Sequence, residues 1–482
     1  MKNRKIVLII LAGVMILSSC TSSFLDEAPS TSVDAATSIK TANDLTDAVN
    51  GLYTATKSSS LFGRDVQVLG DLLADNAFIS SSNYGRFLVE NAYTFSASSG
   101  SASGIWSQGY YTILQANRII RADLPSSATV DQLKGEAYTI RGLTYLVLVN
   151  FFGTPYTINP KAPGVPIVTI PTYVTGPYLK PSRQTVAEVY DRIITDLDSA
   201  FLLMPATSIA STYHATNSNY IAKYAARAII ARAYLYKGDY QKARDAALDV
   251  VKNGGYTLAT TASAFSAYWS SFASVGNKLE TILELNNSTT NNNGGNGLDY
   301  MYNQVGYGDL LANAEVYNLY STTDYRKALI LNGVRKGNSQ KAFVVNKYPN
   351  VSNTDRDEVK LIRYAEVILT LAEAYARTNE EPNALLYLNQ LAKLRDPSFS
   401  GYTSTGQKLL DDILNERRKE LAFEGLRLFD LTRLNLVINR PVQPFSYTTY
   451  TTVLTTDTKR IQAIPLGETD ANPNIEQNPG YN

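Results

Sequence analysis

The sequence predicts a mainly α-helical fold in which helix hairpins stack together and long loop-rich stretches lie between them. Three observations lead to this class. Apolar residues recur at helical spacing in several segments, two distant segments align with each other, and the stretches between them are rich in Pro, Gly, Ser, Asn and Tyr. Apolar residues three and four positions apart share one face of a helix, and that face must pack against a neighbour.

The chain begins with the features of a secretory signal peptide. Three basic residues within the first five precede a run of twelve apolar residues, 6–17, and two serines follow it. This order of charged, apolar and small residues is typical of a cleaved signal. The apolar run is too short to span a bilayer, which requires about 20 residues. We therefore expect residues 1–19 to be removed.

Cys20 is the expected lipid attachment site. The stretch LSSC at 17–20 resembles a bacterial lipobox, and no second cysteine exists to form a disulfide. Several acyl chains on one residue anchor a protein stably. We expect residues 20–30 to form a tether for a body at 31–482, and the acidic pair at 26–27 resembles a signal that routes lipoproteins to the cell surface. The alternative is an ordinary secreted protein with a chance cysteine.

Helical patterns occupy four stretches of the body. They span about residues 36–57, 104–152, 184–251 and 358–435. In residues 184–203 the apolar positions share one helix face, and they are Val186, Val189, Ile193, Leu197 and Phe201. Such a face predicts a helix that packs against its neighbours along one side.

An internal repeat supports the prediction of helix hairpins. Residues 233–251 and 374–392 align without a gap, and each copy has a tyrosine nine residues before a small residue, Ala243 or Ala384. The pattern resembles the tetratricopeptide repeat, a helix hairpin whose small residues allow close contact. Because one hairpin cannot bury its apolar face, several must stack, and we expect degenerate copies elsewhere. The alternative is a set of unrelated helix pairs that share a common alanine spacing.

Four other stretches are expected to be loop-rich. They span about residues 60–103, 153–183, 256–357 and 436–482, and the second of them contains seven prolines. The third includes the polar low-complexity segment NNSTTNNNGGNG at 286–297. Loops of this length are usually functional or disordered, so the ligand site is sought there.

Several motifs follow one another along the chain. They are DLLADN at 71–76, W-x3-Y-x2-I-x2-A-N at 106–117, ERRKELAFEG at 416–425, FDL at 429–431 and QNPGY at 477–481. Together with the lipobox they resemble the SusD/RagB family, the nutrient-binding outer-membrane lipoproteins of Bacteroidetes. The resemblance runs nearly from end to end.

This resemblance implies both a fold and a function. In the fold, four tetratricopeptide-like hairpins form a curved scaffold, and a loop-rich region packed on it carries the ligand site. The protein would be lipid-anchored in the outer membrane and exposed on the cell surface. Its partner would be a SusC-like TonB-dependent outer-membrane transporter, for which it acts as a lid during uptake of glycans or peptides. Such a protein binds its ligand and is not an enzyme.

The overall charge gives no sign of a nucleic-acid partner. The chain has 44 basic and 43 acidic side chains, and loss of residues 1–19 changes the formal net charge from +1 to −2. Neither value indicates nucleic-acid binding or a basic face for membrane binding. No stretch after the signal peptide is long and apolar enough to span a bilayer. The lipid is therefore the expected membrane contact.

No catalytic or metal site follows from the motifs. His214 is the only histidine and the single cysteine is expected to carry lipid, which excludes a zinc cluster and a Ser-His-Asp triad. Asp71, Asp75 and Glu90 give no support for a glycosidase without a known separation. The charged stretch 416–433 places opposite charges three residues apart, which favours a structural helix. No cofactor is expected, although calcium on Asp, Asn and carbonyl oxygens stays open.

Tyrosines in the long polar loops are the candidate ligand contacts. Most of the 33 tyrosines should pack in the scaffold, but those in loops have no helix face to bury them. One group follows residue 82 and another follows the Asn/Gly segment, where the family builds its site. Trp269 is ambiguous, and Trp106 is expected in the core. The candidates are Asn83, Tyr84, Arg86, Tyr93, Trp269, Tyr300, Tyr302 and Tyr307.

Glycan binding is the leading hypothesis. Aromatic rings can stack on the apolar face of a sugar while polar side chains bind its hydroxyls, and we expect the two loops to meet on one face, away from the scaffold. Peptide binding is the alternative within the same class, and the presence of only two tryptophans favours it. A tetratricopeptide adaptor that binds only proteins and a glycan-cleaving enzyme are alternatives from other classes.

Overall fold

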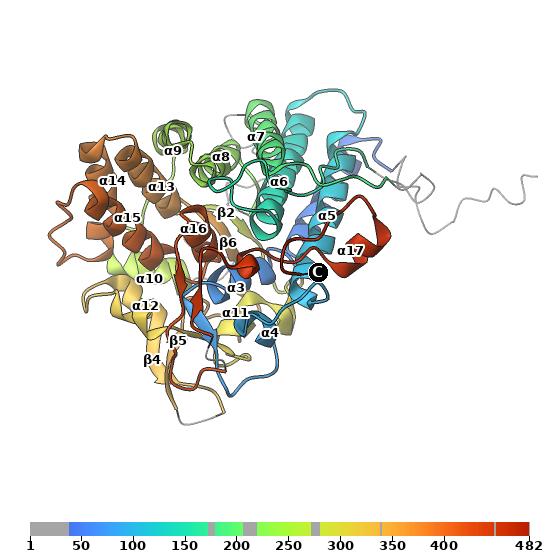
Figure 1. Ribbon diagram of the computed structural model, residues 1–482. Coiled ribbons are helices and arrows are strands. Elements are labelled where there is room, and N and C mark those ends of the chain that lie inside the picture. The colour runs from blue at the N-terminus through green and yellow to red at the C-terminus, as the bar shows by residue number, and fades with distance from the viewer. Residues whose placement is uncertain are drawn as a thin grey trace, which may run out of the picture.

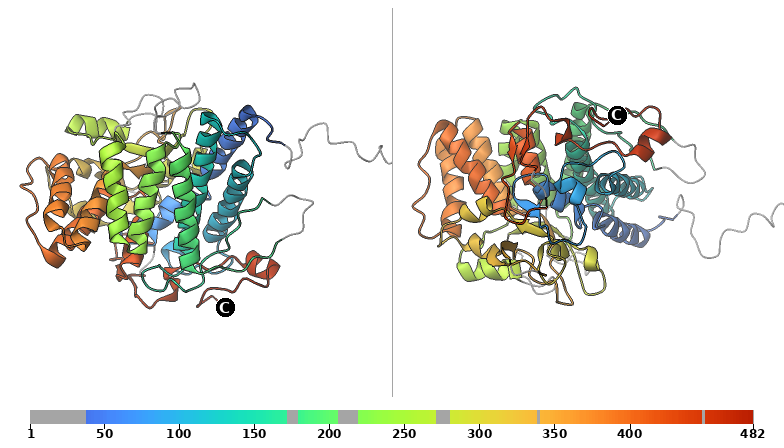
Figure 2. Two further views of the ribbon diagram at one scale, coloured as in Figure 1. Left: turned by 90° about the horizontal axis from the view of Figure 1, so that it is seen from above. Right: turned by 60° about the horizontal axis from the view of Figure 1, so that its bottom comes forward.

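A row of packed helices runs through most of the structure (Figures 1 and 2). The computed structural model describes residues 38–171, 179–205, 219–270, 280–337, 340–447 and 450–481. Within these residues helices dominate and strands are short, so the predicted mainly α class is confirmed. Cys20, the tether at 20–30 and His214 lie outside the described residues.

Consecutive helices of the row pack against one another, as the view from above shows (Figure 2, left). α13 packs directly on α9, although the whole stretch 254–363 separates them in the sequence. None of the helices in the described part of the chain is long and apolar enough to cross a membrane. The row consists of α2 (Ala42–Thr56), α5 (Gly100–Ile120), α6 (Ala128–Phe152), α7 (Val186–Leu203), α8 (Lys223–Lys237), α9 (Tyr240–Asn253), α13 (Tyr364–Arg377), α14 (Glu381–Arg395) and α15 (Gly406–Leu421).

Helix α7 illustrates how the sequence determines where a helix begins and which of its faces is buried. A capping box begins it: the Glu188 N–H donates to the Thr185 hydroxyl at 3.2 Å, and the Thr185 N–H donates to the Glu188 carboxylate at 2.8 Å. Of the five apolar residues predicted to share a face, four are buried, and Phe201 is half-buried against Tyr224 at the edge. This face packs against α6 and α8.

The internal repeat forms two helix hairpins, α8–α9 and α13–α14. Gly238 and Asn379 occupy the same position in the two copies, and both adopt positive φ, 77° and 61°. A left-handed residue at this point ends a helix and turns the chain. Ala243 and Ala384 are fully buried in the second helix of each hairpin. The tetratricopeptide-like interpretation of the repeat is therefore confirmed.

The stretch 60–103 is more regular than the sequence indicates. It includes α3 (Asp65–Leu72), β1 (Ala77–Ile79) and the short α4 (Leu88–Asn91). All eight residues of α3 are buried, among them two aspartates and a glutamine. Because a helix buried on every side has no polar face, α3 lacks the periodicity by which a surface helix is recognised.

Four antiparallel two-stranded ladders occur in the described residues. In the first ladder Phe78 lies opposite Leu311, which joins the first long loop region to the third. The pairs are β1 with β3 (Leu310–Ala312), β2 (Thr281–Leu285) with β6 (Val359–Arg363), β4 (Ile330–Val334) with β5 (Lys341–Val345), and β7 (Ile438–Asn439) with β8 (Thr452–Val453).

The other short helices lie mainly in the loop-rich region, which Figure 1 shows below the row. This region holds α3, α4 and the β4–β5 hairpin on one side of the scaffold. The remaining elements are α10 (Ala262–Ser270), α11 (Leu298–Tyr302), α12 (Ala314–Asn318), α16 (Arg427–Arg433), α17 (Leu466–Ala471) and the 3-10 helices η2 (Gly294–Asn296), η3 (Tyr325–Leu329) and η4 (Thr458–Arg460).

The charged stretch 416–433 is two helices joined by a turn and not the single helix that its charge spacing predicts. Between α15 and α16, Phe423 and Gly425 adopt positive φ, 66° and 78°. Asp71 on α3 holds this turn, because its carboxylate accepts the N–H groups of Phe423 and Gly425 at 3.2 and 2.7 Å. Burial raises the pKa of Asp71 to about 6. Asp75 forms an ion pair with Arg427 at 2.7 Å.

The charges of this stretch are structural, but only some pair along the helix. Of the four pairs that the spacing predicts, Glu416–Lys419 and Asp430–Arg433 form, at 2.6 and 3.0 Å. The other two, Arg417–Glu420 and Glu424–Arg427, do not form, because Glu420 and Glu424 pair with Arg363 of β6, at 2.9 and 2.7 Å. These buried ion pairs connect the end of α15 and the turn after it to β6. Buried charges of this kind must be paired, since an isolated one costs several kcal/mol.

Candidate functional site

Two loops that are distant in the sequence meet beside the β1–β3 ladder, as the sequence analysis expects. The ring centroids of Tyr84 and Tyr307 are 5.4 Å apart, and those of Tyr307 and Tyr300 are 5.5 Å apart. Tyr84 is 54% exposed, and the other two rings are half-buried. We refer to Tyr84, Tyr300 and Tyr307 as the tyrosine platform.

Three cations border the tyrosine platform, and one of them, the buried Arg356, has its guanidinium carbon 4.7 Å from the centroid of the Tyr300 ring. The guanidinium carbon of Arg86 lies 3.5 Å from the centroid of the Tyr307 ring. The Lys336 Nζ lies 5.8 Å from the centroid of the Tyr84 ring. A cation over an aromatic ring contributes about 0.5–1 kcal/mol at an exposed site. The platform therefore combines exposed aromatic area with positive charge.

The loop that carries Tyr84 is held by short polar contacts. The Asn83 amide donates to the Ser80 carbonyl at 2.8 Å, and its oxygen accepts the Gly85 N–H at 2.9 Å. Gly85 adopts a φ of 85°, which glycine reaches at little cost. The Tyr84 N–H donates to the Asp309 carboxylate at 3.1 Å. Asn83 therefore braces the loop that presents the Tyr84 ring.

Asp309 connects three segments beneath the platform. Besides the Tyr84 N–H, it accepts a hydrogen bond from Arg335 Nη2 at 3.0 Å. Arg335 also donates to the Ser82 carbonyl at 3.0 Å and to Gln304 Oε1 at 3.2 Å. Burial raises the pKa of Asp309, while the Tyr84 N–H and the Arg335 charge act to lower it. The network fixes both platform loops to the turn after β4.

A tight turn places Tyr307 beside Tyr300. The Tyr307 N–H donates to the Tyr300 carbonyl at 2.8 Å. A Cβ on Gly306 would lie 2.7 Å from the Tyr300 Cα, so the turn requires glycine there. A Cβ on Gly295 would lie 3.3 Å from the Tyr307 hydroxyl oxygen. The Asn/Gly segment 286–297 therefore lies against the platform.

Tyr93 and Tyr302 are not exposed, and the expectation that they face a ligand is wrong. Tyr93 is 4% exposed, its hydroxyl donates to the Leu73 carbonyl, and its ring stacks on Tyr450 at 5.0 Å. Tyr302 is fully buried and stacks on Tyr348 at 5.9 Å. Burial raises the pKa of both hydroxyls. These rings have no scaffold face to cover them, but other loop residues bury them instead.

Trp269, which the sequence leaves ambiguous, is also buried and lies apart from the platform. It belongs to a small cluster with Phe265 and Tyr268. The Lys347 Nζ and the Arg363 guanidinium carbon lie 4.4 and 5.1 Å from its ring centroids. The Trp269 ring therefore packs against the buried cations of the ion pairs described above and has no exposed face for a ligand.

The sequence does not predict the places of Lys336 and the Asp309–Arg335 pair at the platform. Lys336 follows β4, and the β4–β5 ladder, which pairs Val334 with Lys341, carries it to the platform. No local pattern distinguishes it from other exposed lysines. Its position depends on two strand pairings, and pairings between distant segments leave little trace in a single sequence.

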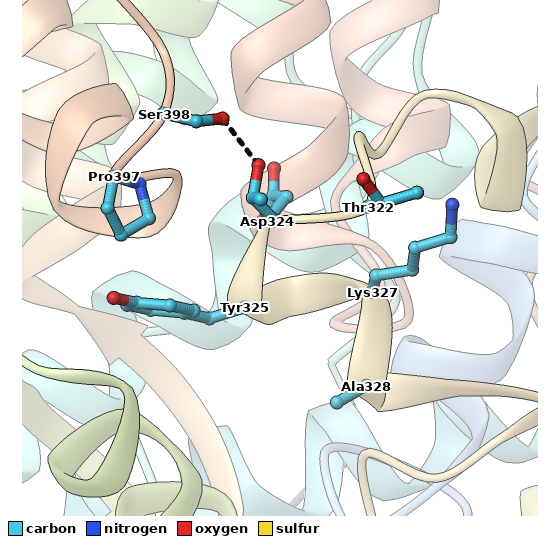
Figure 3. Close-up of a pocket in the computed structure, with 8 residues that line it drawn as sticks. Thr322, Asp324, Tyr325, Lys327, Ala328, Pro397 and Ser398 are labelled. Atoms are coloured by element: carbon cyan, nitrogen blue, oxygen red, sulfur yellow. Dashed lines mark hydrogen bonds between the residues drawn. The ribbon is translucent and has the colours of Figure 1, made fainter.

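A hollow of about 800 Å³ lies apart from the platform, between η3 and the turn after α14 (Figure 3). Its lining includes Thr323, Tyr325, Lys327 and Ser398. The hydroxyls of Thr323 and Ser398 lie 2.5 Å apart, and each is within hydrogen-bond distance of the Asp396 carboxylate, at 2.7 and 2.9 Å. Because these polar groups already bind one another, this hollow offers a ligand less than the platform does.

Another hollow, of about 660 Å³, lies between α5, the proline-rich connector and α17. Its lining is largely apolar and includes Tyr110, Tyr111 and Ile475. Trp106 forms part of the wall but is only 1% exposed and packs edge-on against Phe152 at 5.0 Å. Trp106 is therefore a core residue, as predicted.

Comparisons with known proteins agree with this architecture. One family model, described as "SusD family", matches residues 330–481, and another, described as "Starch-binding associating with outer membrane", matches residues 23–235. The chain is 28% identical to SusD-like protein P2 of Formosa agariphila, across 90% of this chain and 91% of the relative.

Solved structures extend the similarity to the three-dimensional fold. A SusD superfamily protein of Bacteroides thetaiotaomicron is 30% identical, with a TM-score of 0.81 over 91% of this chain and 100% of that one. A SusD superfamily protein of Bacteroides vulgatus is 28% identical, with a TM-score of 0.80 over 92% of this chain and 100% of that one.

Proposed function

The chain belongs to the SusD/RagB family, and one of its matching family models is described as starch-binding and associated with the outer membrane; on this premise we propose a specific role for it. It is a lipoprotein, anchored through Cys20 and exposed on the cell surface. It binds oligosaccharides without cleaving them. It acts as the lid of a SusC-like TonB-dependent outer-membrane transporter during nutrient uptake.

The tyrosine platform is the observation that best supports glycan binding. Tyr84 stands 54% exposed at the point where two fixed loops meet, and its ring is inclined by 56° to that of Tyr307. Large rings that are held in place lose little entropy when a ligand stacks on them. The bordering cations supply hydrogen-bond donors for hydroxyl or acidic groups. This combination suits a sugar, which has an apolar face and polar edges.

We infer a transporter partner because binding alone does not move a ligand across the membrane. The described helices include none that could span a membrane, and a bound ligand on the outer surface must still cross it. The family model that matches residues 23–235 is described as associating with the outer membrane. A lid that closes over a transporter would deliver the ligand that the platform holds.

Peptide binding is the second candidate. The platform contains three tyrosines and no tryptophan, and tyrosine rings serve peptides as well as sugars. The two candidates differ in the ligand alone, so a binding assay with both ligand classes separates them. Binding of peptides without binding of any glycan would replace the glycan by a peptide in this proposal.

Calorimetry with a panel of oligosaccharides tests the proposed site. We expect Tyr84→Ala and Tyr307→Ala each to weaken binding roughly tenfold or more, since base–aromatic stacking, the nearest analogue, contributes about 1–3 kcal/mol per ring. Tyr111→Ala is the matched control, because Tyr111 is 52% exposed but lies in the hollow beside α5. Unchanged affinity in both platform variants, with unchanged melting temperature, would place the ligand elsewhere.

A further inference from the structure

The positive charge beside the tyrosine platform is only partly neutralised by the fold. Arg86 is half-buried and stacks on Tyr307, yet in the described part of the chain its guanidinium has neither an ion pair nor a protein hydrogen-bond acceptor. Lys336 is exposed, and its ammonium donates to two carbonyls, those of Val305 and Gly306, at 3.1 and 2.6 Å. An ammonium has three donors, so one remains available.

The buried carboxylates nearest the platform are paired with other cations. Asp309 is paired with the buried Arg335 at 3.0 Å. Asp299, beneath Tyr300, is held by two nitrogens of Arg356, both at 2.5 Å. Each of these pairs is close to neutral. Asp309 also interacts electrostatically with Arg86 and Lys336, but one carboxylate that faces three cations leaves a net positive charge at the surface where the Tyr84 ring is exposed.

Arg86 is presented in a form suited to an oxyanion. A guanidinium offers planar paired donors that match the geometry of a carboxylate or sulfate, and stacking on an aromatic ring holds it in one orientation. Most exposed arginines are mobile, but this one lies 3.5 Å from the Tyr307 centroid. Its donors are therefore pre-positioned beside the rings on which a sugar would stack.

We propose that the ligands of this surface are acidic glycans, oligosaccharides that carry carboxylate or sulfate groups. The tyrosine rings stack on the faces of the sugars, while Arg86 and Lys336 bind the acidic group of a neighbouring unit. This inference rests on the proposed glycan-binding function and names the substrate class. In this proposal Arg86 and Lys336 contact the ligand directly, unlike charged side chains that contact only solvent.

Matched ligand pairs provide the test. One arm compares oligogalacturonides with their methyl esters, and the other compares sulfated galactan oligosaccharides with their desulfated forms, each by calorimetry at about 20 mM and about 200 mM salt. We expect the acidic member of at least one pair to bind tenfold or more tightly at low salt, and its advantage to shrink at high salt because the ions screen the attraction. The arm that responds identifies carboxylate or sulfate as the recognised group.

Two outcomes separate this inference from the function beneath it. If glycans bind but the neutral member of each pair binds as tightly as the acidic one, the inference is overturned and glycan binding stands. If no oligosaccharide of a broad panel binds, neutral or acidic, the proposed function itself fails, and this inference fails with it.

Charge-removing variants assign the effect to residues. We expect Arg86→Gln and Lys336→Gln to weaken binding of the acidic member severalfold to tenfold and that of the neutral member clearly less, because the glutamine amide still donates to a hydroxyl but carries no charge. Lys252→Gln is the matched control, because Lys252 is exposed on α9 and its replacement alters net charge equally. Equal loss for both ligand members in both variants, with unchanged melting temperature, would show that these cations only support the loops.

Discussion

Single buried carboxylates hold the surface loops of this protein in place. Asp357 accepts the N–H of Asn350 at 2.7 Å and its side-chain amide at 2.8 Å, while the Asp357 carbonyl accepts the Asn287 amide at 2.7 Å. It therefore supports the base of the Asn/Gly segment. Burial, with a smaller contribution from the nearby charge of Asp299, raises the pKa of Asp357 to about 7.

This raised pKa predicts how Asp357 affects stability. Its ordinary value is 3.8, so between about pH 4 and pH 7 the folded state binds more protons than the unfolded chain. Its contribution to the free energy of unfolding must then fall as pH rises through this window. In denaturant unfolding from pH 4.5 to 8, the free energy of unfolding of the wild type minus that of Asp357→Asn should decrease as pH rises. A difference that stays constant would contradict the assignment.

At the residue scale, the sequence predicts chemistry better than exposure. Tyr84, Arg86, Tyr300 and Tyr307 come together because their loops are anchored to adjacent strands, and their residue types already suggest a ligand surface. Tyr93, in the same kind of loop, is instead covered by residues from the C-terminal region. Which loop covers which ring depends on tertiary packing, and a single sequence does not contain that information in a local pattern.

At the element scale, the turn between α15 and α16 depends on a close approach to α3. A Cβ on Gly425 would lie 2.5 Å from the Gln67 Cα, and a Cβ on Gly70 would lie 1.9 Å from the Gly425 carbonyl oxygen. Gly425 also adopts a φ of 78°. Two glycines therefore allow α3 to contact the turn, where Asp71 binds its N–H groups.

The same substitution at two glycines should have opposite effects. Gly425→Ala should lower the free energy of unfolding by about 3 kcal/mol or more, because it adds a backbone clash to an unfavourable φ. Gly51→Ala, in the exposed middle of α2 with no atom within 4 Å of the new Cβ, should raise it by about 0.5–1 kcal/mol. Denaturant unfolding measures both. Comparable stability of the two variants would show that the turn tolerates a side chain.

The sequence reveals elements that have a polar face or belong to the repeat. α7 follows its predicted apolar face, and the α8–α9 and α13–α14 hairpins follow the repeat, although residues Tyr364–Tyr375 of α13 are all buried. α3 is buried all round, and β1 and β3 have three residues each, so neither periodicity nor length marks them. Yet it is the β1–β3 ladder that brings the platform loops together.

At the scale of the whole molecule, the helix row and the loop-rich region have different roles. The helices form a packed row, and the loop-rich region, which contains the platform, lies on one side of it (Figures 1 and 2). The ordered motifs of the sequence are enough to identify this architecture through the family. They do not identify the ligand, because Lys336 and the Asp309–Arg335 pair reach the platform through contacts between distant segments.

The proposed lipid attachment to the cell concerns the whole molecule and has its own test. We expect Cys20→Ala to shift the protein from the outer-membrane fraction to the soluble fraction, or to leave it unprocessed, since no other lipid anchor is expected. Wild-type protein, extracted in mild detergent from cells grown on the inducing nutrient, should co-purify with a TonB-dependent transporter. Membrane retention of the variant in cells that lack the transporter would refute the lipid tether.

The central claim is that the two joined loops form the ligand site, and a crystal structure of a complex tests it most directly. The protein should be crystallised with the oligosaccharide that binds most tightly in the calorimetric panel. We expect a sugar ring stacked on Tyr84 or Tyr307, with a polar or acidic group of the ligand within hydrogen-bond distance of Arg86. A ligand bound in the hollow beside η3 or in the hollow beside α5, with the tyrosine platform empty, would contradict the claim.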